Sequence, residues 1–257
     1  MPKIHPTAII EPGAQLDDSV DVGAYSVVGP QVRIGPRTQV MQHVVLAGTT
    51  TIGAECTIFP FASLGQMTQD LKFKGGTPRV EIGDRNTIRE YVTVNAATND
   101  GDVTRIGSGC HIMAYVHIAH DCIIGNEVII GNATTLAGHI VIEDHAGLSG
   151  LVGVHQFVRI GRLCYIGGCS KITQDLPPFM LADGNPLEVA TINSVGLKRG
   201  GVSDEAQGLL KKAHRILYRE KLSTRQALEK IEAELEPVPE IQQLVAFIKA
   251  STRGIAR

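Results

Sequence analysis

The chain has 257 residues, 24 Lys and Arg against 26 Asp and Glu, and a formal net charge of −2. This balance gives no overall attraction to nucleic acid or to an anionic membrane. No apolar run approaches the roughly 20 residues that a membrane-spanning helix needs, and no export signal is recognisable at the N-terminus. The five cysteines are an odd number without CxxC spacing, so we expect a cytoplasmic protein.

Aliphatic residues recur at every sixth position from Ile4 to Ile172. Of the 29 positions in this series, 26 are Ile, Leu or Val. A period of six fits neither a helix nor a plain alternating strand, but it fits a short strand plus a corner, with three such units in each coil. We therefore predict a mainly β protein, with a parallel β-helix shaped as a triangular prism over residues 1–190.

The three exceptions in the series are Asp70, Gly76 and Asp100. They fall in two polar stretches near residues 65–81 and 95–105. Because the aliphatic series resumes after each stretch, we predict that both are loop insertions into an otherwise regular prism.

Glycine often follows the inward aliphatic residue, for example at Gly107 and Gly131. Since glycine reaches backbone angles that other residues avoid, we interpret these glycines as corner residues. Small or β-branched residues stand four positions after each aliphatic residue. Four cysteines share this slot, and we expect them to be buried packing residues rather than redox or metal groups: Cys56, Cys110, Cys122 and Cys164.

The repeats fade near Pro177, and a bridging segment is expected up to about Val202. Ser203 is typical of a helix N-cap and is followed by apolar residues at helical spacing. A second helix is predicted from about Ser223 and a third after Pro239.

These helices would form a small α-helical C-terminal domain over residues 191–257. One helix face is basic, which usually means only a solvated face, although it would also attract an acidic partner. It carries Lys211, Lys212, Arg215, Arg219 and Lys221.

Several histidines gather on one edge of the prism if each coil takes three of the repeating units. A single histidine on such a face is more often a hydrogen-bonded surface residue, so the clustering itself indicates a site. Two adjacent columns and their neighbours contain His117, His120, Asp121, Gly138, His139, His155 and Gln156.

Such a cluster suits general-base chemistry, because a neutral imidazole with a pKa near 6.5 can take a proton from an attacking hydroxyl. Asp121 would fix the tautomer of His120, and the N–H of Gly138 would hold a developing oxyanion. No nucleophilic Ser or Cys–His pair is evident, which favours direct transfer. Three histidines on a β-helix are also typical of zinc hydratases of the carbonic-anhydrase type.

Ordered motifs run along nearly the whole chain. They are Gln69-Asp70-Leu71-Lys72, Ile82-Gly83-Asp84-Arg85-Asn86, Ile88-Arg89-Glu90, His117-Ile118-Ala119-His120-Asp121, Leu136-Ala137-Gly138-His139, Val154-His155-Gln156-Phe157 and Ser251-Thr252-Arg253-Gly254. The set closely resembles the UDP-N-acetylglucosamine O-acyltransferases, a family of hexapeptide-repeat acyltransferases. The resemblance implies a left-handed β-helix and a homotrimer with sites between subunits.

The resemblance also implies the reaction. A (R)-3-hydroxyacyl chain would pass from acyl carrier protein to the 3-position of UDP-N-acetylglucosamine, or of its 3-amino analogue, as the first step of lipid A biosynthesis. Neither a cofactor nor a metal is expected. The basic helical face would receive the acidic acyl carrier protein.

By resemblance, His120 would be the general base, Asp121 would assist it, and Gly138 would supply the oxyanion N–H. Arg199 would bind phosphate, and Gly168 would leave room for the acyl chain. The full set of substrate-binding positions would be Asp70, Lys72, His117, His139, His155, Gln156, Gly168, Asn193 and Arg199.

Three positions depart from the family pattern. Asn95-Ala96-Ala97-Thr98 stands where a His-Arg-Gly-Thr type of stretch is usual, Val195 replaces a Glu and Gly200 replaces an Arg. These departures leave open which of the two sugars is the acceptor, and the acyl length is open as well.

Two further hypotheses come from other classes of protein. A zinc hydratase is disfavoured by the basic helical tail and by Gln156, and an inactive β-helix that only binds acyl carrier protein is disfavoured by the intact His120, Asp121 and Gly138. Two other transferases, an acetyl-CoA-dependent hexapeptide enzyme and the later N-acyltransferase of the same pathway, rank below the main prediction.

Overall fold

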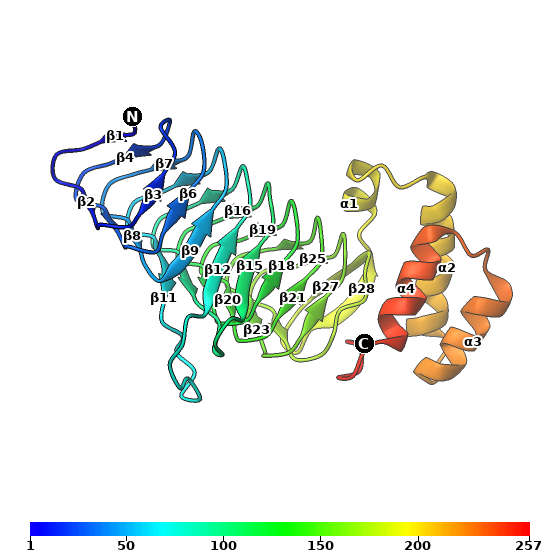
Figure 1. Cartoon of the computed structure of the whole chain (residues 1–257). Coiled ribbons are helices and arrows are strands. Elements are labelled where there is room, and N and C mark those ends of the chain that lie inside the picture. The colour runs from blue at the N-terminus through cyan, green and yellow to red at the C-terminus, as the bar shows by residue number, and fades with distance from the viewer.

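The computed structural model describes all residues from Met1 to Arg257. Short strands and turns wind into a long triangular prism, and a group of helices closes its C-terminal end (Figure 1). The prism has three faces, each a sheet whose strands come from successive coils. The predicted fold class, a left-handed parallel β-helix followed by α-helices, is confirmed.

The first sheet contains, in spatial order, β1 (Lys3–Ile4), β4 (Asp21–Val22), β7 (Gln39–Val40), β10 (Thr57–Ile58), β13 (Thr87–Ile88), β16 (His111–Ile112), β19 (Ile129–Ile130), β22 (Gly147–Leu148), β25 (Tyr165–Ile166), β27 (Met180–Asp183) and β28 (Glu188–Ile192). The second contains β2 (Ile9–Ile10), β5 (Val27–Val28), β8 (Val45–Leu46), β11 (Ser63–Gln66), β14 (Thr93–Asn95), β17 (His117–Ile118), β20 (Thr135–Leu136), β23 (Gly153–Val154) and β26 (Lys171–Ile172). The third contains β3 (Gln15–Leu16), β6 (Arg33–Ile34), β9 (Thr49–Ile52), β12 (Arg79–Ile82), β15 (Val103–Ile106), β18 (Ile123–Ile124), β21 (Val141–Ile142) and β24 (Arg159–Ile160).

The register between coils follows the six-residue period. Ile118 pairs with Leu136 in the next coil, so an undisturbed coil takes three of the repeating units. Two coils are longer, because one loop leaves the prism between β11 and β12 and another between β14 and β15. The first of these loops projects far from the prism, in cyan in Figure 1.

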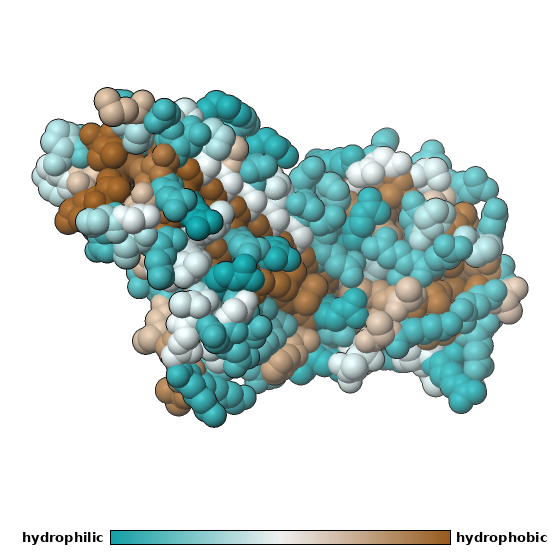
Figure 2. Space-filling view, viewed as in Figure 1, coloured by the Kyte–Doolittle hydropathy of each residue, from teal (hydrophilic) through white to brown (hydrophobic).

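The inward aliphatic residues form the core. Ile112 and Ile130 are fully buried, because successive coils stack these two side chains directly on each other. Ile118 is fully buried in the same way against Leu136 of the second sheet. The N-terminal coil has no neighbour on its outer side, so Ile4 is 40% exposed, and apolar residues are visible at that end of the prism (Figure 2).

The glycines that follow the inward aliphatic residues do not serve the predicted role. Left-handed φ angles occur instead at a later corner position, for example 61° at Asp121 and 60° at His139. Gly107 lies outside this region, but a Cβ on it would lie 2.5 Å from the carbonyl oxygen of Gly125 in the next coil. These glycines are therefore required by the close approach of coils and not by unusual angles.

One edge of the prism, between the first and second sheets, carries a stack of aromatic rings. Neighbouring ring centroids are between 4.8 and 5.2 Å apart, and the planes are nearly parallel. We call this the aromatic edge; it contains Tyr25, His43, Phe61, Tyr91 and Tyr115. All of these side chains are exposed in the single chain.

The segment expected only to bridge the two parts is ordered. The strands β27 and β28 form an antiparallel hairpin, and α1 (Ser194–Arg199) follows it. Because β28 crosses the expected border at residues 190 and 191, the division of the chain into two domains stays a prediction.

Three longer helices follow, α2 (Asp204–Arg219), α3 (Thr224–Glu234) and α4 (Pro239–Lys249). The predicted N-cap at Ser203 and the predicted helix start near Ser223 are confirmed, since the hydroxyls of both serines accept hydrogen bonds from the first turns. None of the helices combines the length and the apolar character that crossing a membrane requires.

Candidate active site

The candidate site lies at the corner between the second and third sheets. We call it the His120 corner; it consists of residues 119–122 together with the same corner of the next two coils, residues 137–140 and 155–158. The β17 strand ends at Ile118 and β18 begins at Ile123. The turn between them projects the side chains of His120 and Asp121 to the outside.

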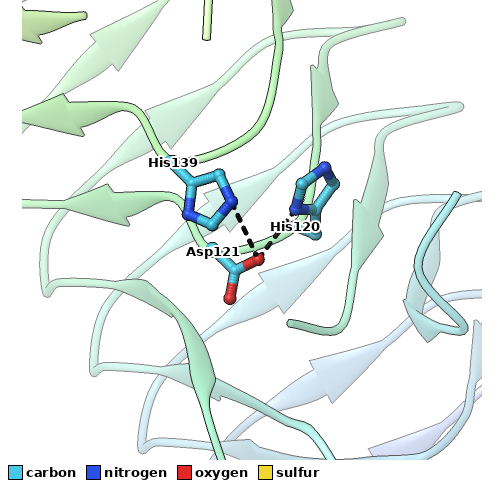
Figure 3. Close-up of side chains that lie close together, drawn as sticks. All are labelled: His120, Asp121 and His139. Carbon is cyan, nitrogen blue, oxygen red and sulfur yellow. Dashed lines mark hydrogen bonds and ion pairs between the residues drawn. The ribbon is translucent and has the colours of Figure 1, made fainter. Parts of the chain in front are cut away.

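His120 and Asp121 form a close pair (Figure 3). Nδ1 of His120 lies 2.7 Å from Oδ2 of Asp121, and the two side chains are only 13% and 9% exposed. A carboxylate at this distance favours the tautomer with a proton on Nδ1. The free lone pair of His120 is therefore on Nε2, which is the arrangement that a general base needs.

His139 stands on the other side of the carboxylate (Figure 3). Its Nε2 lies 3.6 Å from Oδ2 of Asp121, and its ring meets that of His120 edge to face. The ring also stacks on Phe157 with centroids 4.6 Å apart. Asp121 thus lies between two imidazoles, and Phe157 fixes the orientation of the second one.

Gly138 provides the space that the ring of His120 occupies. A Cβ on Gly138 would lie 2.5 Å from Nε2 of His120, so any side chain here would displace the imidazole ring. The N–H of Gly138 donates to no hydrogen bond within the chain. The same is true of the equivalent N–H of Asn132, whereas those of Ser108 and Asn126, at another corner, donate to side chains of the next coil. The free N–H is therefore not unique to Gly138.

His117 lies on β17, three residues before His120. Its Nδ1 is 2.8 Å from the hydroxyl of Thr93. Burial lowers the pKa of His117 below its ordinary value, and the charge of His120 acts in the same direction. The neutral form of His117 is therefore favoured beside His120.

Gln156 and His155 occupy the same corner two coils beyond His120. Both are exposed. Nδ1 of His155 lies 3.3 Å from the guanidinium of Arg253, in the C-terminal tail. The column arithmetic therefore placed these residues on the correct edge, but they make no hydrogen bond or ion pair with His120 or Asp121.

Asp70 and Lys72 lie on the projecting loop between β11 and β12. The side chain of Asp70 accepts a hydrogen bond from the backbone N–H of Lys72, which shapes a turn. The side chain of Lys72 is exposed and forms no ion pair. This loop leaves the prism from the His120 corner, so the structure keeps both residues on the same edge as the base.

Asn193, Arg199 and Gly168 are not brought to this corner. Asn193 and Arg199 line a groove of about 820 Å³ over the first sheet, which we call the Asn193 groove. Gly168 packs against Gly150, which lines the same groove. The side chain of Asn193 also caps α1 and donates to the carbonyl of Leu163.

Cys122 follows Asp121, but it points inward. It is fully buried, its Sγ contacts the carbonyl oxygen of Ala137, and burial raises the pKa of its thiol to about 12. The other three cysteines of this slot are buried as well, as predicted, so none of them offers a thiolate to the site.

Three threonines that the repeat pattern did not indicate surround the His120–Asp121 pair. Thr98 contacts both members of the pair, Thr68 contacts Thr98, and Thr104 accepts a hydrogen bond from the N–H of Asp121. Thr68 and Thr98 lie in the two inserted loops, where counting in whole coils no longer predicts which residues are neighbours. Only their place in the two polar interruptions pointed toward them.

The family model described as "Udp N-acetylglucosamine O-acyltransferase; Domain 2" matches residues 175–256, and the model of the bacterial transferase hexapeptide matches residues 104–138. A relative from Thermodesulfovibrio yellowstonii, named acyl-[acyl-carrier-protein]--UDP-N-acetylglucosamine O-acyltransferase, is 52% identical over the whole of both chains. The chain belongs to the UDP-N-acetylglucosamine O-acyltransferase family. The resemblance found in its motifs is confirmed.

Solved structures of the family agree. The UDP-N-acetylglucosamine acyltransferase from Bacteroides fragilis superposes with a TM-score of 0.95 at 40% identity and covers 98% of this chain and 99% of its own. The enzyme from Acinetobacter baumannii gives a TM-score of 0.94 at 42% identity, with 99% of each chain covered.

The comparisons do not support the zinc hydratase. The relatives are named as acyltransferases. One acid and two imidazoles, those of Asp121, His120 and His139, lie within 4.8 Å of one another, whereas the hydratase hypothesis requires three histidines.

Proposed function

We propose that this chain transfers a (R)-3-hydroxyacyl group from acyl carrier protein to the 3-position of UDP-N-acetylglucosamine or of its 3-amino analogue. The observation that carries the proposal is the His120–Asp121 pair. One ring nitrogen is 2.7 Å from a buried carboxylate, and the other lies beside Gly138, where a Cβ would come within 2.5 Å of it. Membership in the family supplies the donor and acceptor classes.

Each group has one task in the reaction. Nε2 of His120 takes the proton of the acceptor hydroxyl or amine while that atom attacks the thioester carbonyl. The N–H of Gly138 donates to the oxyanion of the tetrahedral intermediate. When the intermediate collapses, the C–S bond breaks, and the imidazolium returns the proton to the departing thiolate. Asp121 stabilises the imidazolium between the two steps.

We propose that the acceptor lies between two subunits of a homotrimer. Its reacting end would meet the His120 corner of one subunit, near His117, His139, His155 and Gln156. Its diphosphate would meet Arg199 and Asn193 in the groove of the next subunit. The single chain supports this arrangement, because it carries these two groups on different faces of the prism.

The difference in charge between the second and third sheets supports the same arrangement. The second sheet lies between the aromatic edge and the His120 corner, and its outward positions carry no charged side chain before Lys171. They are Ile9, Val27, Val45, Ser63, Thr93, His117, Thr135 and Gly153. The outward positions of the third sheet include Arg33, Glu81, Arg105 and Arg159. We propose that the second sheet faces the three-fold axis, since the core of an interface is depleted in charge.

The projecting loop would carry Asp70 and Lys72 to the donor or the sugar from the edge of the site. Gly168, which has no side chain, would leave room for the end of the acyl chain.

The acyl carrier protein would meet the basic side of α2. Lys211, Lys212 and Lys221 are exposed and unpaired, whereas Arg215 pairs with Glu220 and Arg219 donates to the carbonyl of Ala190. An acidic partner would therefore meet the three lysines first. A cytoplasmic location is proposed as well, on the basis of five free thiols.

The direct test is acyl transfer from a panel of 3-hydroxyacyl carrier proteins to the two candidate sugars, with His120→Ala beside the unaltered chain. We expect transfer that falls by about 10²- to 10⁴-fold in the variant. The preferred pair of substrates would settle chain length and sugar. A folded protein without transfer to either sugar would leave only the binding function.

The shared site is tested by mixing variants. His120→Ala and Arg199→Ala chains, co-expressed with different tags in equal amounts, would place an intact pair of groups at about a quarter of the interfaces of a random trimer. Activity would reappear in the mixture although each variant alone is impaired. If both groups served the site from the same chain, mixing would restore nothing.

A further inference from the structure

The hydroxyl of Thr98 lies 3.0 Å from Nδ1 of His120. The backbone N–H of the same residue lies 3.2 Å from Oδ2 of Asp121. Thr98 is thus a single residue in contact with both members of the pair. It is only 5% exposed, so these contacts are largely shielded from competition with water.

The protons of this group have one consistent arrangement. If the hydroxyl of Thr98 donated to Nδ1, that nitrogen would present a lone pair to the carboxylate of Asp121 at 2.7 Å, which is repulsive. Nδ1 therefore carries the proton, and Asp121 and Thr98 share it as acceptors. The hydroxyl proton of Thr98 is then free to point toward Thr68.

Thr68 continues the chain of contacts into the projecting loop. Its Oγ1 lies 3.4 Å from Oγ1 of Thr98, and it accepts a hydrogen bond from the N–H of Asp70 at 3.1 Å. The side chain of Asp70 in turn accepts a hydrogen bond from the backbone N–H of Lys72. A continuous series of hydrogen bonds therefore runs from the loop turn to the imidazole.

We propose that Thr98 is a positioning residue: it holds the His120–Asp121 pair in the geometry and tautomer that leave Nε2 basic, and through Thr68 it couples that pair to the loop that carries Asp70 and Lys72. The proposal rests on the proposed role of His120 as the base. The loop and the base would then adjust together, so that the base is best ordered when the loop holds its present position.

The first test compares Thr98→Val, which removes the hydroxyl, with Thr98→Ser, which keeps it. Loss of one hydrogen bond would lower kcat by about five- to tenfold, with the KM values of donor and acceptor changed less than about twofold. Thr98→Ser would restore kcat to within about twofold of the unaltered enzyme.

A matched control is Thr38→Val. Thr38 is also fully buried, and its hydroxyl donates to the carbonyl of Gly53 and accepts from the N–H of Cys56. It lies at a different corner of the prism. This variant would lose thermal stability but keep kcat. If both variants lost kcat in proportion to their loss of stability, Thr98 would have only a structural role.

The second test concerns the coupling to the loop. Thr68→Val alone would lower kcat by about two- to threefold, and the Thr68→Val, Thr98→Val double variant would be no slower than Thr98→Val alone, because both remove one series of contacts. Additive losses would overturn the coupling. If Thr98→Val does not fold, the two other variants still test the proposal. The proposal requires a fall in kcat in Thr68→Val and nearly unchanged kcat in Thr98→Ser.

His120→Ala separates the two levels of the argument. If it keeps full activity, the base itself is wrongly assigned. If it loses activity while Thr98→Val keeps wild-type kcat, the general base stands and the role of Thr98 is refuted.

Discussion

Nδ1 of His120 lies 2.7 Å from Oδ2 of Asp121, and this contact determines which nitrogen of the ring is basic. The carboxylate also lies 3.6 Å from Nε2 of His139. Asp121 is therefore the charge around which the two imidazoles are arranged. We therefore expect the proposed transferase chemistry to depend on this carboxylate as much as on His120.

Asp121→Asn preserves the size of the side chain and removes its charge. The amide no longer stabilises the imidazolium and no longer enforces a proton on Nδ1, so kcat would fall by about 10²- to 10⁴-fold. The check is kcat under saturating substrates, together with circular dichroism to verify folding. Asp17→Asn, in the first coils, serves as the control and keeps full activity. A fall of less than about fivefold would contradict the role of the charge.

Gly138→Ala tests space separately from hydrogen bonding, because alanine retains the backbone N–H. The added Cβ would lie 2.5 Å from Nε2 of His120, so the ring must move. A displacement of about 1 Å would reduce kcat by about 10²-fold. Gly208→Ala is the matched control, since a Cβ there meets nothing within 4 Å. Wild-type kcat in Gly138→Ala would show that the ring has room to move without consequence.

Cys122→Ala would leave kcat within about threefold of the unaltered enzyme, since the thiol is fully buried and burial raises its pKa to about 12. The lost sulfur leaves a small cavity, which would lower the free energy of unfolding by roughly 1 kcal/mol or more. Urea unfolding measures the second effect. Mass spectrometry of the enzyme mixed with 3-hydroxyacyl-loaded acyl carrier protein would find no acylated chain, whereas an acyl adduct on Cys122 would refute direct transfer.

The buried His214, in α2, is expected to make the free energy of unfolding depend on pH. Burial lowers its pKa, the charge of Arg219 acts in the same direction, and its Nε2 has no hydrogen-bond partner. Below the ordinary histidine pKa of about 6.5, His214 is protonated in the unfolded chain but stays neutral in the folded chain. The free energy of unfolding therefore decreases as the pH falls through that value toward 5.

The variant His214→Phe keeps a ring beside Tyr218 and removes the titration. Its unfolding free energy would be measured in urea at pH 5, 6 and 7.5 and at one protein concentration. It would decrease less steeply with falling pH than that of the unaltered chain, and the two slopes would differ by at most about 1.4 kcal/mol per pH unit. His117 has a pKa lowered in the same way, so some pH dependence would remain. An unchanged slope would show that His214 is not neutralised by burial in the native protein.

The regular part of the site was predictable because the coils repeat. With three repeating units per coil, His120 falls beside Gly138 and Asp121 beside His139, and the structure places them so. The same arithmetic fails at the two inserted loops, where the offset between neighbouring strands exceeds one regular coil. Thr68 and Thr98 reach the base from those loops, and no periodicity indicates where an inserted segment folds back.

The prediction that the glycines after the aliphatic residues adopt unusual backbone angles is wrong. A six-residue repeat with glycine after the aliphatic residue predicts a tight corner, but it does not say whether the constraint is an angle or a contact. The structure shows a contact, since the carbonyl oxygen of Gly125 occupies the space of a Cβ on Gly107.

The sequence by itself determined the prism, the inward packing of Ile118 and Cys122, the helix N-cap at Ser203, the start of a helix near Ser223, and the edge on which the histidines gather. These features follow from local periodicity and capping, which depend on residues close together along the chain. Only the tertiary structure decided the 2.7 Å contact between His120 and Asp121, the contacts of Thr98 and the separation of Asn193 and Arg199 from His120. Those features depend on where loops and distant elements meet in space, which the spacing of residues along the chain does not encode.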